Sequence, residues 1–294
     1  MIVAMKFVTA SLEGGLPGIL LEDGSIALLR DALPHGCRTL NEFILSCTEE
    51  DIRALEGVER GERACRRTHS TLLSPIPSSL HDIICVGVNY WDHLKESQEF
   101  KGKSEAPLKT VYFSKRGAEI AGPDAPIPSH SALDAALDYE VELAVVIGSR
   151  ISSDALPEEI PSKIFGYTIF NDISARTLQN SHGQWFYGKS LDGFSVMGPY
   201  IALARDYKGE PELELSSRVN GELRQSSNTR LLRKSVTELL YELSRGITLY
   251  PGDIVSTGTP AGVGMGFKPP RWLKPGDTVE CRIETLGVLR NTVL

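Results

Sequence analysis

Several features that mark particular protein classes are scarce in this chain or missing from it. Its 294 residues include only five cysteines, which are scattered and form no Cys-x-x-Cys pair, so we expect reduced thiols in a cytoplasmic protein. No apolar run reaches the length of a transmembrane helix, and residues 1–8 have the pattern of a strand rather than of a signal peptide. The net charge of −7 comes without a basic stripe. We therefore expect neither a membrane nor nucleic acid as a partner.

Two glycine motifs resemble nucleotide-binding sequences but lack the required surroundings. Residues 183–190 fit the P-loop pattern, but the interior of the loop is Trp-Phe-Tyr, which leaves no room for backbone N–H groups to wrap a phosphate. Residues 262–266 (Gly-Val-Gly-Met-Gly) are followed by Pro269-Pro270, which forbid the helix that should hold a pyrophosphate. No Gly-x-Ser-x-Gly elbow is present for a serine hydrolase. Nucleotide binding and serine catalysis are both disfavoured.

The remaining pattern predicts a small N-terminal domain, a linker and a large β-rich domain. Residues 1–72 combine short antiparallel strands with helices over Thr39–Cys47 and Thr48–Cys65, the second capped by Thr48 with Asp51. Residues 73–82 form a Pro/Ser linker, and residues 83–294 form the large domain. One long helix is expected over Ser235–Arg245. Strands are expected over Ile83–Gly87, Thr110–Phe113, Tyr139–Ile147, Gly166–Asp172, Val196–Leu203, Leu213–Asn220, Asp253–Thr257 and Val279–Glu284.

Three carboxylates fall at the ends of two predicted strands. Glu140 and Glu142 are two residues apart in an apolar run, so they share one face of a strand. Asp172 ends the run Tyr167–Phe170. Carboxylates that meet at strand ends repel each other unless a cation lies between them, and oxygen ligands suit Mg²⁺ or Mn²⁺. The alternative is that Glu-Val-Glu forms the solvated face of a surface strand.

A histidine and a glutamate follow the strand Ile83–Gly87. Asn89 is expected to cap a short helix, which places His93 and Glu96 on one face. A glutamate that accepts from one imidazole nitrogen makes the other a general base. The polar residues 97–107 are expected to form a mobile lid over a substrate. The alternative is an exposed turn with an ordinary His–Glu contact.

In these segments the chain resembles the fumarylacetoacetate hydrolase family, specifically its acylpyruvase-like branch, over nearly its whole length. The resemblance implies an α+β, β-rich fold, in which a mixed β-sheet roll or sandwich forms the core beside a small N-terminal domain. It also implies a homodimer. Six segments carry the resemblance in the family's order: residues 87–96, 138–148, 166–179, 188–192, 251–264 and 274–280.

The resemblance also assigns roles to individual residues. It implies one Mg²⁺ or Mn²⁺ ion per subunit, held by Glu140, Glu142 and Asp172, with a His93–Glu96 dyad above it and Lys189 beside it. Arg176 and Gln179 would lie near the substrate and Thr259 would contact its carboxylate, although Arg176 could instead be a structural partner of Asp172 or of the sheet. One departure is that Leu191-Asp-Gly-Phe stands where the family often has Phe-Asp-Thr-Phe.

The expected reaction is metal-dependent hydrolysis of a carbon–carbon bond. A 2,4-diketo acid of the acylpyruvate type would be cleaved to pyruvate and a carboxylic acid, with His93 deprotonating the water and Gln179 polarising the distal carbonyl. The same site also suits an oxaloacetate decarboxylase or a hydroxymuconate-type isomerase. A non-catalytic binding protein is a third possibility, which the intact His93–Glu96 pair disfavours.

Overall fold

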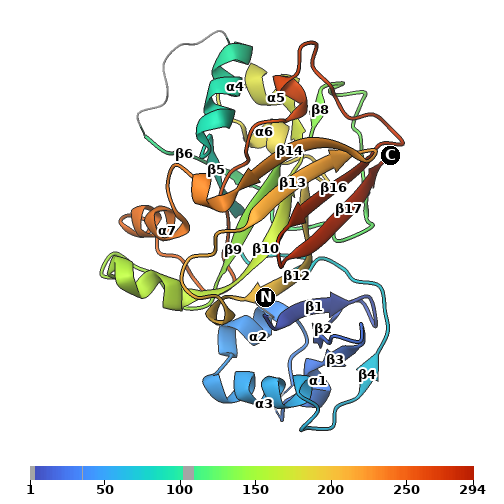
Figure 1. Ribbon diagram of the computed structural model, residues 1–294, viewed down its shortest axis with the longest axis vertical. Coiled ribbons are helices and arrows are strands. Elements are labelled where there is room, and N and C mark those ends of the chain that lie inside the picture. Colours follow the sequence, from blue (N-terminus) through green and yellow to red (C-terminus); the bar gives the residue numbers. More distant parts are fainter. Residues whose placement is uncertain (1–3, 35, 102–108) are drawn as a thin grey trace.

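The protein consists of two packed β-sheets with short helices around them (Figure 1). The computed structural model describes residues 4–34, 36–101 and 109–294. The predicted α+β, β-rich fold is confirmed. Within the described residues, no helix has the length and apolar composition needed to cross a membrane.

The larger sheet has ten strands in the order β4-β3-β2-β1-β12-β10-β9-β15-β5-β6. Neighbouring strands are antiparallel except for β15 and β5, which are parallel. The strands are β1 (Lys6–Ala10), β2 (Leu16–Leu20), β3 (Ile26–Leu28), β4 (Arg67–Thr68), β5 (Ile83–Gly87), β6 (Val111–Lys115), β9 (Val141–Ile147), β10 (Ile164–Asp172), β12 (Ser195–Leu203) and β15 (Ile254–Ser256).

The second sheet packs against the centre of the first. Its order is β14-β13-β16-β17-β7, and a separate pair joins β8 to β11. Alternate β9 residues such as Leu143 and Val145 enter the core shared with this sheet, while Ala144 and Val146 enter a second core on the other face. Because both faces are covered, all of β9 is buried and its sequence is a continuous apolar run. These strands are β7 (Pro126–Ile127), β8 (Leu137–Asp138), β11 (Ser174–Ala175), β13 (Glu214–Val219), β14 (Glu222–Asn228), β16 (Thr278–Ile283) and β17 (Gly287–Val293).

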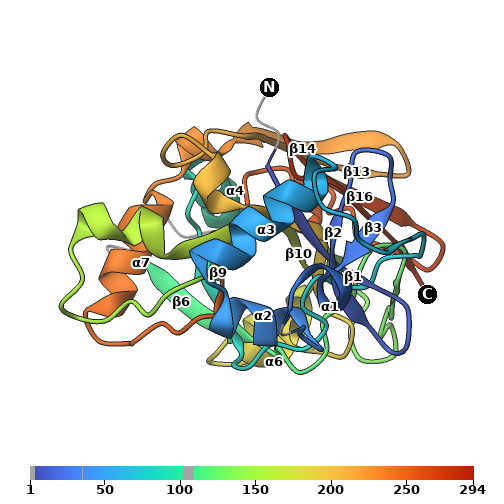
Figure 2. The ribbon, with the colours of Figure 1, turned by 90° about the horizontal axis from the view of Figure 1, so that it is seen from below.

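The N-terminal residues gather at one end of the molecule, where helices α1 (Leu29–Ala32), α2 (Leu40–Ser46) and α3 (Glu49–Glu59) lie in front of the strands (Figure 2). The predicted cap of α3 is present, with Thr48 and Asp51 bonded to each other's backbone N–H. The helix ends well before Cys65, because Gly61 has a φ of +73°. Strand β1 pairs with β12, so the N-terminal strands extend the large sheet. The division at residues 73–82 stays a prediction.

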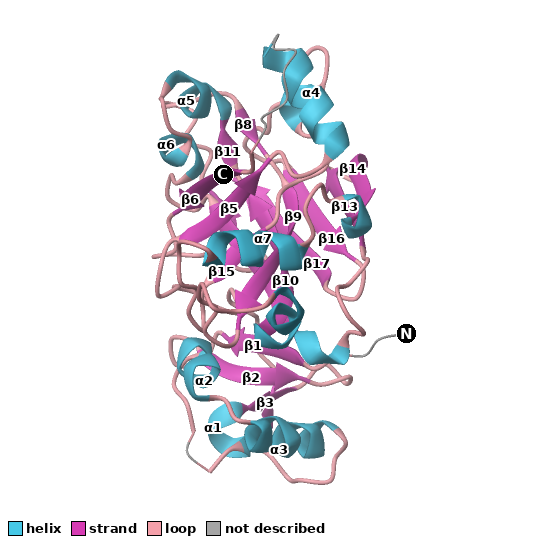
Figure 3. Ribbon diagram, turned by 90° about the vertical axis from the view of Figure 1, so that its left-hand side faces the viewer, coloured by secondary structure: helices cyan, strands magenta, loops and turns pink. Residues whose placement is uncertain are grey.

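Three helices gather at the opposite end, around β8 and β11 (Figure 3). They are α4 (Trp91–Lys101), α5 (Arg176–Ser181) and α6 (Phe186–Lys189). The P-loop-like segment, residues 183–190, contains only the short helix α6. Elsewhere, α7 (Val236–Ser244) has the predicted bounds within one residue, and 3₁₀ helices occur at Pro157–Lys163, Ala204–Asp206, Thr229–Leu231 and Gly264–Gly266.

Candidate active site

The register between β9 and β10 brings the three predicted carboxylates together. Glu142 pairs with Phe170, and the N–H of Asp172 donates to the carbonyl of Glu140 at 3.0 Å. Residues that face each other across antiparallel strands share one side of the sheet, so all three acids lie on one side. Each offers an oxygen, and these atoms lie within 4.8 Å of one another. All three residues are buried, so the alternative of a solvated strand face is wrong.

Two buried lysines neutralise part of this acidic cluster. Lys189 Nζ, at the end of α6, lies 2.7 Å from Glu140 Oε2 and 2.8 Å from Asp172 Oδ2. Burial alone would lower the pKa of the Lys189 ammonium, but Asp172 and Glu140 outweigh it and raise that pKa. Lys115, at the end of β6, lies 2.6 Å from Asp172 Oδ1 and donates to the Ile173 carbonyl. Lys115 was not predicted as a site residue. Its only indication in the sequence is that a lysine ends the mostly apolar strand β6.

Glu142 is the member of the cluster with no cationic side chain bonded to it among the described residues. Its Oε2 accepts from the Ser256 hydroxyl at 2.5 Å and from the Gly258 N–H at 3.0 Å. Burial raises the pKa of Glu142 well above its usual range, and the charges of Asp172 and Glu140 raise it further. Burial acts in the same direction on Glu140, but Lys189 and Arg176 hold the pKa of Glu140 well below its usual range. Glu142 is therefore the carboxylate that gains most from an added cation.

Arg176 forms ion pairs with Asp138 and Glu140 and not with Asp172, the partner considered from the sequence. Its Nε lies 2.8 Å from Asp138 Oδ2, and its second terminal nitrogen lies 2.6 Å from Glu140 Oε1. Its remaining terminal N–H donates to Gln179 Oε1 at 3.0 Å. Asp138, which the sequence analysis did not single out as a site residue, also accepts from the backbone N–H groups of Gly264 and Met265. Arg176 is thus not a partner of Asp172, and it holds both Glu140 and Gln179 in place.

The predicted His93–Glu96 dyad is present on α4. His93 Nδ1 lies 2.9 Å from Glu96 Oε2, and the other oxygen of Glu96 accepts from the Gly262 N–H at 2.9 Å. A carboxylate can only accept, so Nδ1 carries the hydrogen and Nε2 is left as the basic nitrogen. His93 is buried, so the alternative of an exposed His–Glu contact is wrong.

The surroundings of the dyad differ from the sequence prediction in one respect. Asn89 does not cap α4, because its amide donates to the carbonyls of Thr257 and Lys234 and so ties the start of the helix to the sheet. Gly266 packs directly on the dyad, since a Cβ at this position would lie 1.8 Å from Glu96 Oε1. The predicted lid, residues 97–107, begins as the last turn of α4. The rest of that segment lies outside the described residues.

The contacts of two further residues, Thr259 and Gly193, bear on the roles expected for them. Thr259 borders the cavity, but its hydroxyl donates to the Val141 carbonyl at 2.9 Å and accepts from the Gln225 amide at 2.7 Å. Its one hydroxyl hydrogen is therefore committed to the protein. The contact between Thr259 and a substrate carboxylate stays a prediction. Gly193, where the sequence departs from the family pattern, has a φ of +77°, and a Cβ there would lie 2.5 Å from Pro128 Cδ. The glycine thus serves the local backbone, and Lys189 keeps its position.

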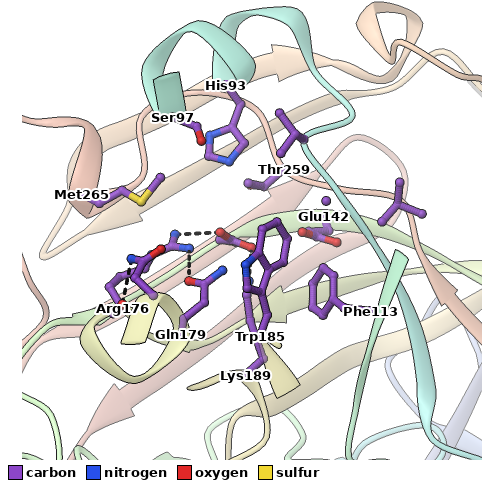
Figure 4. Close-up of a pocket in the computed structure, with 15 residues that line it drawn as sticks. His93, Ser97, Phe113, Glu142, Arg176, Gln179, Trp185, Lys189, Thr259 and Met265 are labelled. Atoms are coloured by element: carbon purple, nitrogen blue, oxygen red, sulfur yellow. Dashed lines mark hydrogen bonds and ion pairs between the residues drawn. The ribbon is translucent and has the colours of Figure 1, made fainter. Parts of the chain in front are cut away.

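A small cavity, partly open to solvent, lies between α4 and the acidic cluster. In Figure 4, His93 and Ser97 point into it from α4, while Arg176, Gln179 and Lys189 lie on the opposite side. Phe113 and Trp185, whose rings are 5.2 Å apart, form an aromatic wall that also contacts Lys189. Of the cavity residues, the sequence analysis missed Val86, Gly87, Val88, Ser97, Phe113, Asn180, Trp185 and Met265 as site residues.

The residues present fit a divalent metal ion. The donor set is all oxygen, as hard cations require. In and around the cluster, five acidic side chains face only three basic ones, so a divalent ion would balance the excess of acidic groups. The carboxylates are those of Glu96, Asp138, Glu140, Glu142 and Asp172, and the cations are Lys115, Arg176 and Lys189.

Known proteins are similar to this chain in sequence and in fold. The model of the fumarylacetoacetate (FAA) hydrolase C-terminal family matches residues 82–294. Oxaloacetate tautomerase YisK from Bacillus subtilis (strain 168) is 43% identical over 307 aligned residues, which cover 98% of this chain and 100% of that protein. The solved structure of fumarylacetoacetate hydrolase (EaFAH) from psychrophilic Exiguobacterium antarcticum is 38% identical, with a TM-score of 0.83 over 99% of both chains. That of 5-carboxymethyl-2-hydroxymuconate delta-isomerase from Mycobacterium smegmatis is 30% identical, with a TM-score of 0.75 over 99% of both chains.

Proposed function

The chain belongs to the fumarylacetoacetate hydrolase family, and from this premise we propose that it interconverts the enol and keto forms of oxaloacetate or of a 2-oxodicarboxylic acid of similar size. The observation that carries the proposal is the buried His93 imidazole, which Glu96 orients so that its basic nitrogen faces the acidic cluster. The full-length likeness to a protein named oxaloacetate tautomerase supports this choice of substrate. We therefore prefer proton transfer to the hydrolysis expected from the sequence.

Glu140, Glu142 and Asp172 would hold Mg²⁺ or Mn²⁺, which when bound would anchor the carboxylate and 2-oxo oxygens of the substrate and stabilise negative charge on the latter. Lys189 would act on the same oxygen. Two of the three ammonium hydrogens go to Glu140 and Asp172, which leaves the third free to donate to the substrate.

His93 would move the proton at C3. In the keto-to-enol direction, neutral Nε2 takes a proton from C3, the C–H electrons form the C2–C3 double bond, and the carbonyl electrons move to the 2-oxo oxygen. That oxygen then gains a proton from the imidazolium or from water. Glu96 stabilises the imidazolium that forms, and Gly262 and Gly266 keep the carboxylate in position. The enol-to-keto direction reverses these steps, so no covalent nucleophile is needed.

Hydrolysis of acylpyruvates is the second candidate. The same nitrogen of His93 could deprotonate a water, and the amide of Gln179, held by Arg176, could donate to the carbonyl oxygen that the water attacks. The likeness to fumarylacetoacetate hydrolase (EaFAH) supports this reaction. Decarboxylation of oxaloacetate would use the charge-stabilising residues but not the base, so it should survive the loss of His93.

One set of assays separates these reactions. Freshly dissolved enol oxaloacetate, followed by ultraviolet absorbance and proton NMR with Mg²⁺ or Mn²⁺, should convert to the keto form faster with the protein than without it. His93→Asn should slow this conversion about 100- to 10,000-fold while leaving metal affinity within about twofold. Tautomerisation at the uncatalysed rate, together with turnover of acetylpyruvate to pyruvate and acetate, would replace the proposal with the hydrolase. Pyruvate and CO₂ from oxaloacetate, unchanged in His93→Asn, would replace it with the decarboxylase.

A further inference from the structure

Ser97 presents a hydroxyl to the cavity that the proposed chemistry does not use. It lies one helical turn after His93 on α4, so the two side chains project from the same face. Figure 4 shows the Ser97 oxygen beside the imidazole, pointing into the cavity. The residue is only 9% exposed, and no group in the described part of the chain hydrogen-bonds to its Oγ. The hydroxyl is therefore available to a ligand in the cavity, and a ligand that displaces water from it must supply a hydrogen-bond partner in return.

Gln179 presents a second donor from the opposite side of the cavity. An arginine N–H can only donate, so the bond from Arg176 fixes Oε1 of Gln179 as the acceptor and turns the Nε2 amide toward the cavity. No group among the described residues accepts from that amide. The charge of Arg176 polarises it through the shared bond and makes it a stronger donor.

These two donors flank the place where the far end of a bound 2-oxo acid must lie. The carboxylate and 2-oxo oxygens belong at the acidic cluster, and C3 lies next to His93. The group at C4 therefore falls beside Ser97, which is adjacent to His93 on the helix. A carboxylate at C4 can accept from both donors, whereas an alkyl tail satisfies neither.

We propose that Ser97 Oγ–H and Gln179 Nε2–H bind the distal carboxylate of the substrate, and that Ser97 is the residue that selects a 2-oxodicarboxylic acid over a 2-oxo monocarboxylic acid with an alkyl tail. This inference rests on the proposed function, because it takes the substrate's head to lie at the acidic cluster and C3 to lie at His93. The site is expected to be selective because an apolar tail would leave the Ser97 and Gln179 donors without hydrogen-bond partners.

The first test is ligand binding, which needs no turnover. L-Malate and 2-hydroxybutyrate share a 2-hydroxy acid head and differ in that malate ends in a carboxylate. Calorimetry on Mn²⁺-loaded protein should show that Ser97→Ala weakens malate about 10-fold and changes 2-hydroxybutyrate less than about twofold. Ser97→Thr, which keeps the hydroxyl, should restore malate affinity. Alanine is a better helix former than serine, so α4 should remain folded in the Ala variant. Equal effects on both ligands, or a wild-type protein that does not prefer malate, would overturn the proposal.

The second test is kinetic and separates this inference from the proposed function. In the tautomerisation assay, Ser97→Ala should raise KM for oxaloacetate about 10-fold with kcat little changed. If malate selectivity depends on Ser97 but no tautomerisation occurs, the distal subsite stands and the proposed function fails. If tautomerisation is rapid and Ser97→Ala leaves both KM and malate affinity unchanged, the function stands and this inference fails.

Discussion

Lys115 Nζ lies 2.6 Å from Asp172 Oδ1, and neither side chain exposes any surface to solvent. The lysine comes from β6, at one edge of the large sheet, and the aspartate ends β10, near its centre. Lys189 contacts the other oxygen of the same carboxylate. Asp172 is therefore fixed at both oxygens before any ligand enters, which limits how far it can move toward or away from Glu140 and Glu142.

We expect Lys115→Met to destabilise the metal-free protein by about 3–5 kcal/mol, because it removes one partner from a fully buried carboxylate. Urea denaturation in the presence of a chelator would measure the loss. The matched control is Lys268→Met, since the Lys268–Glu99 pair is 77% and 66% exposed and should contribute little. If the two variants unfold at the same urea concentration, Lys115 does not hold Asp172 as described.

In the Glu142→Gln variant, we expect the free energy of unfolding to depend much less on divalent cations. In the wild-type protein, Mn²⁺ at a hundredfold excess over its dissociation constant should add about 2.7 kcal/mol to the free energy of unfolding. The variant replaces the carboxylate that has no cationic partner of its own, so the same Mn²⁺ should add much less. Thermal unfolding with and without Mn²⁺ tests this. Glu280→Gln, on β16 and outside the acidic cluster, should respond as the wild-type protein does.

Gly266→Ala should impair catalysis without removing a functional group. Its new Cβ would lie 1.8 Å from Glu96 Oε1, so Glu96 must shift and release His93. We expect tautomerisation to slow by about 10- to 100-fold while Mn²⁺ still stabilises the variant. Gly246→Ala is the control, because a Cβ there meets nothing within 4 Å. Full activity in Gly266→Ala would show that the Glu96 contact does not orient the base.

Glu242 should make stability depend on pH below neutrality. Burial alone would raise the pKa of Glu242, but hydrogen bonds from Lys234, Tyr112 and Thr110 outweigh it and lower that pKa from 4.5. A lowered pKa means that the charged form stabilises the fold above the unfolded-state pKa, and that this stabilisation is lost as the pH falls through the folded-state value. The Glu242 side chain is 39% exposed, so the contribution should be at most about 1 kcal/mol.

The measurement is the difference in unfolding free energy between the wild-type protein and Glu242→Gln at pH 6 and at pH 3. The difference should favour the wild-type protein at pH 6 and shrink at pH 3. A difference that is constant with pH, or that grows on acidification, would contradict the lowered pKa. Tyr112→Phe tests the hydrogen bond separately, since it should reduce the pH-dependent part of the difference.

Local sequence patterns predicted much of the fold near the site. The apolar run of β9 and its period of two placed Glu140 and Glu142 on one face, and the cap residues Thr48 and Ser235 marked where α3 and α7 begin. These features depend on residues only a few positions apart. Strands β14 and β17 were missed, because neither has a continuous apolar run: β14 has one buried residue, the polar Gln225, and β17 alternates buried residues with exposed ones.

Such local patterns could not predict contacts between residues that are far apart in the sequence. Asn89 looked like a helix cap, but the sheet and the start of α7 supply better partners for its amide. For Thr259, no local pattern indicated that its hydroxyl donates to the Val141 carbonyl. In both cases a polar side chain bonds to a residue more than a hundred positions away along the chain.

The sequence by itself determined where β9, β10 and α7 form, that Glu140 and Glu142 share one face, and that His93 and Glu96 can meet one turn apart, because each follows from backbone periodicity. Only the tertiary structure decided that Lys115, Asp138 and Arg176 surround the acids, that Gly266 presses on Glu96, and that Ser97 faces Gln179 across a cavity. Those relationships depend on how β6, β8 and α5 are placed by packing around both sheets, and the order of residues along the chain does not encode that packing in any local pattern.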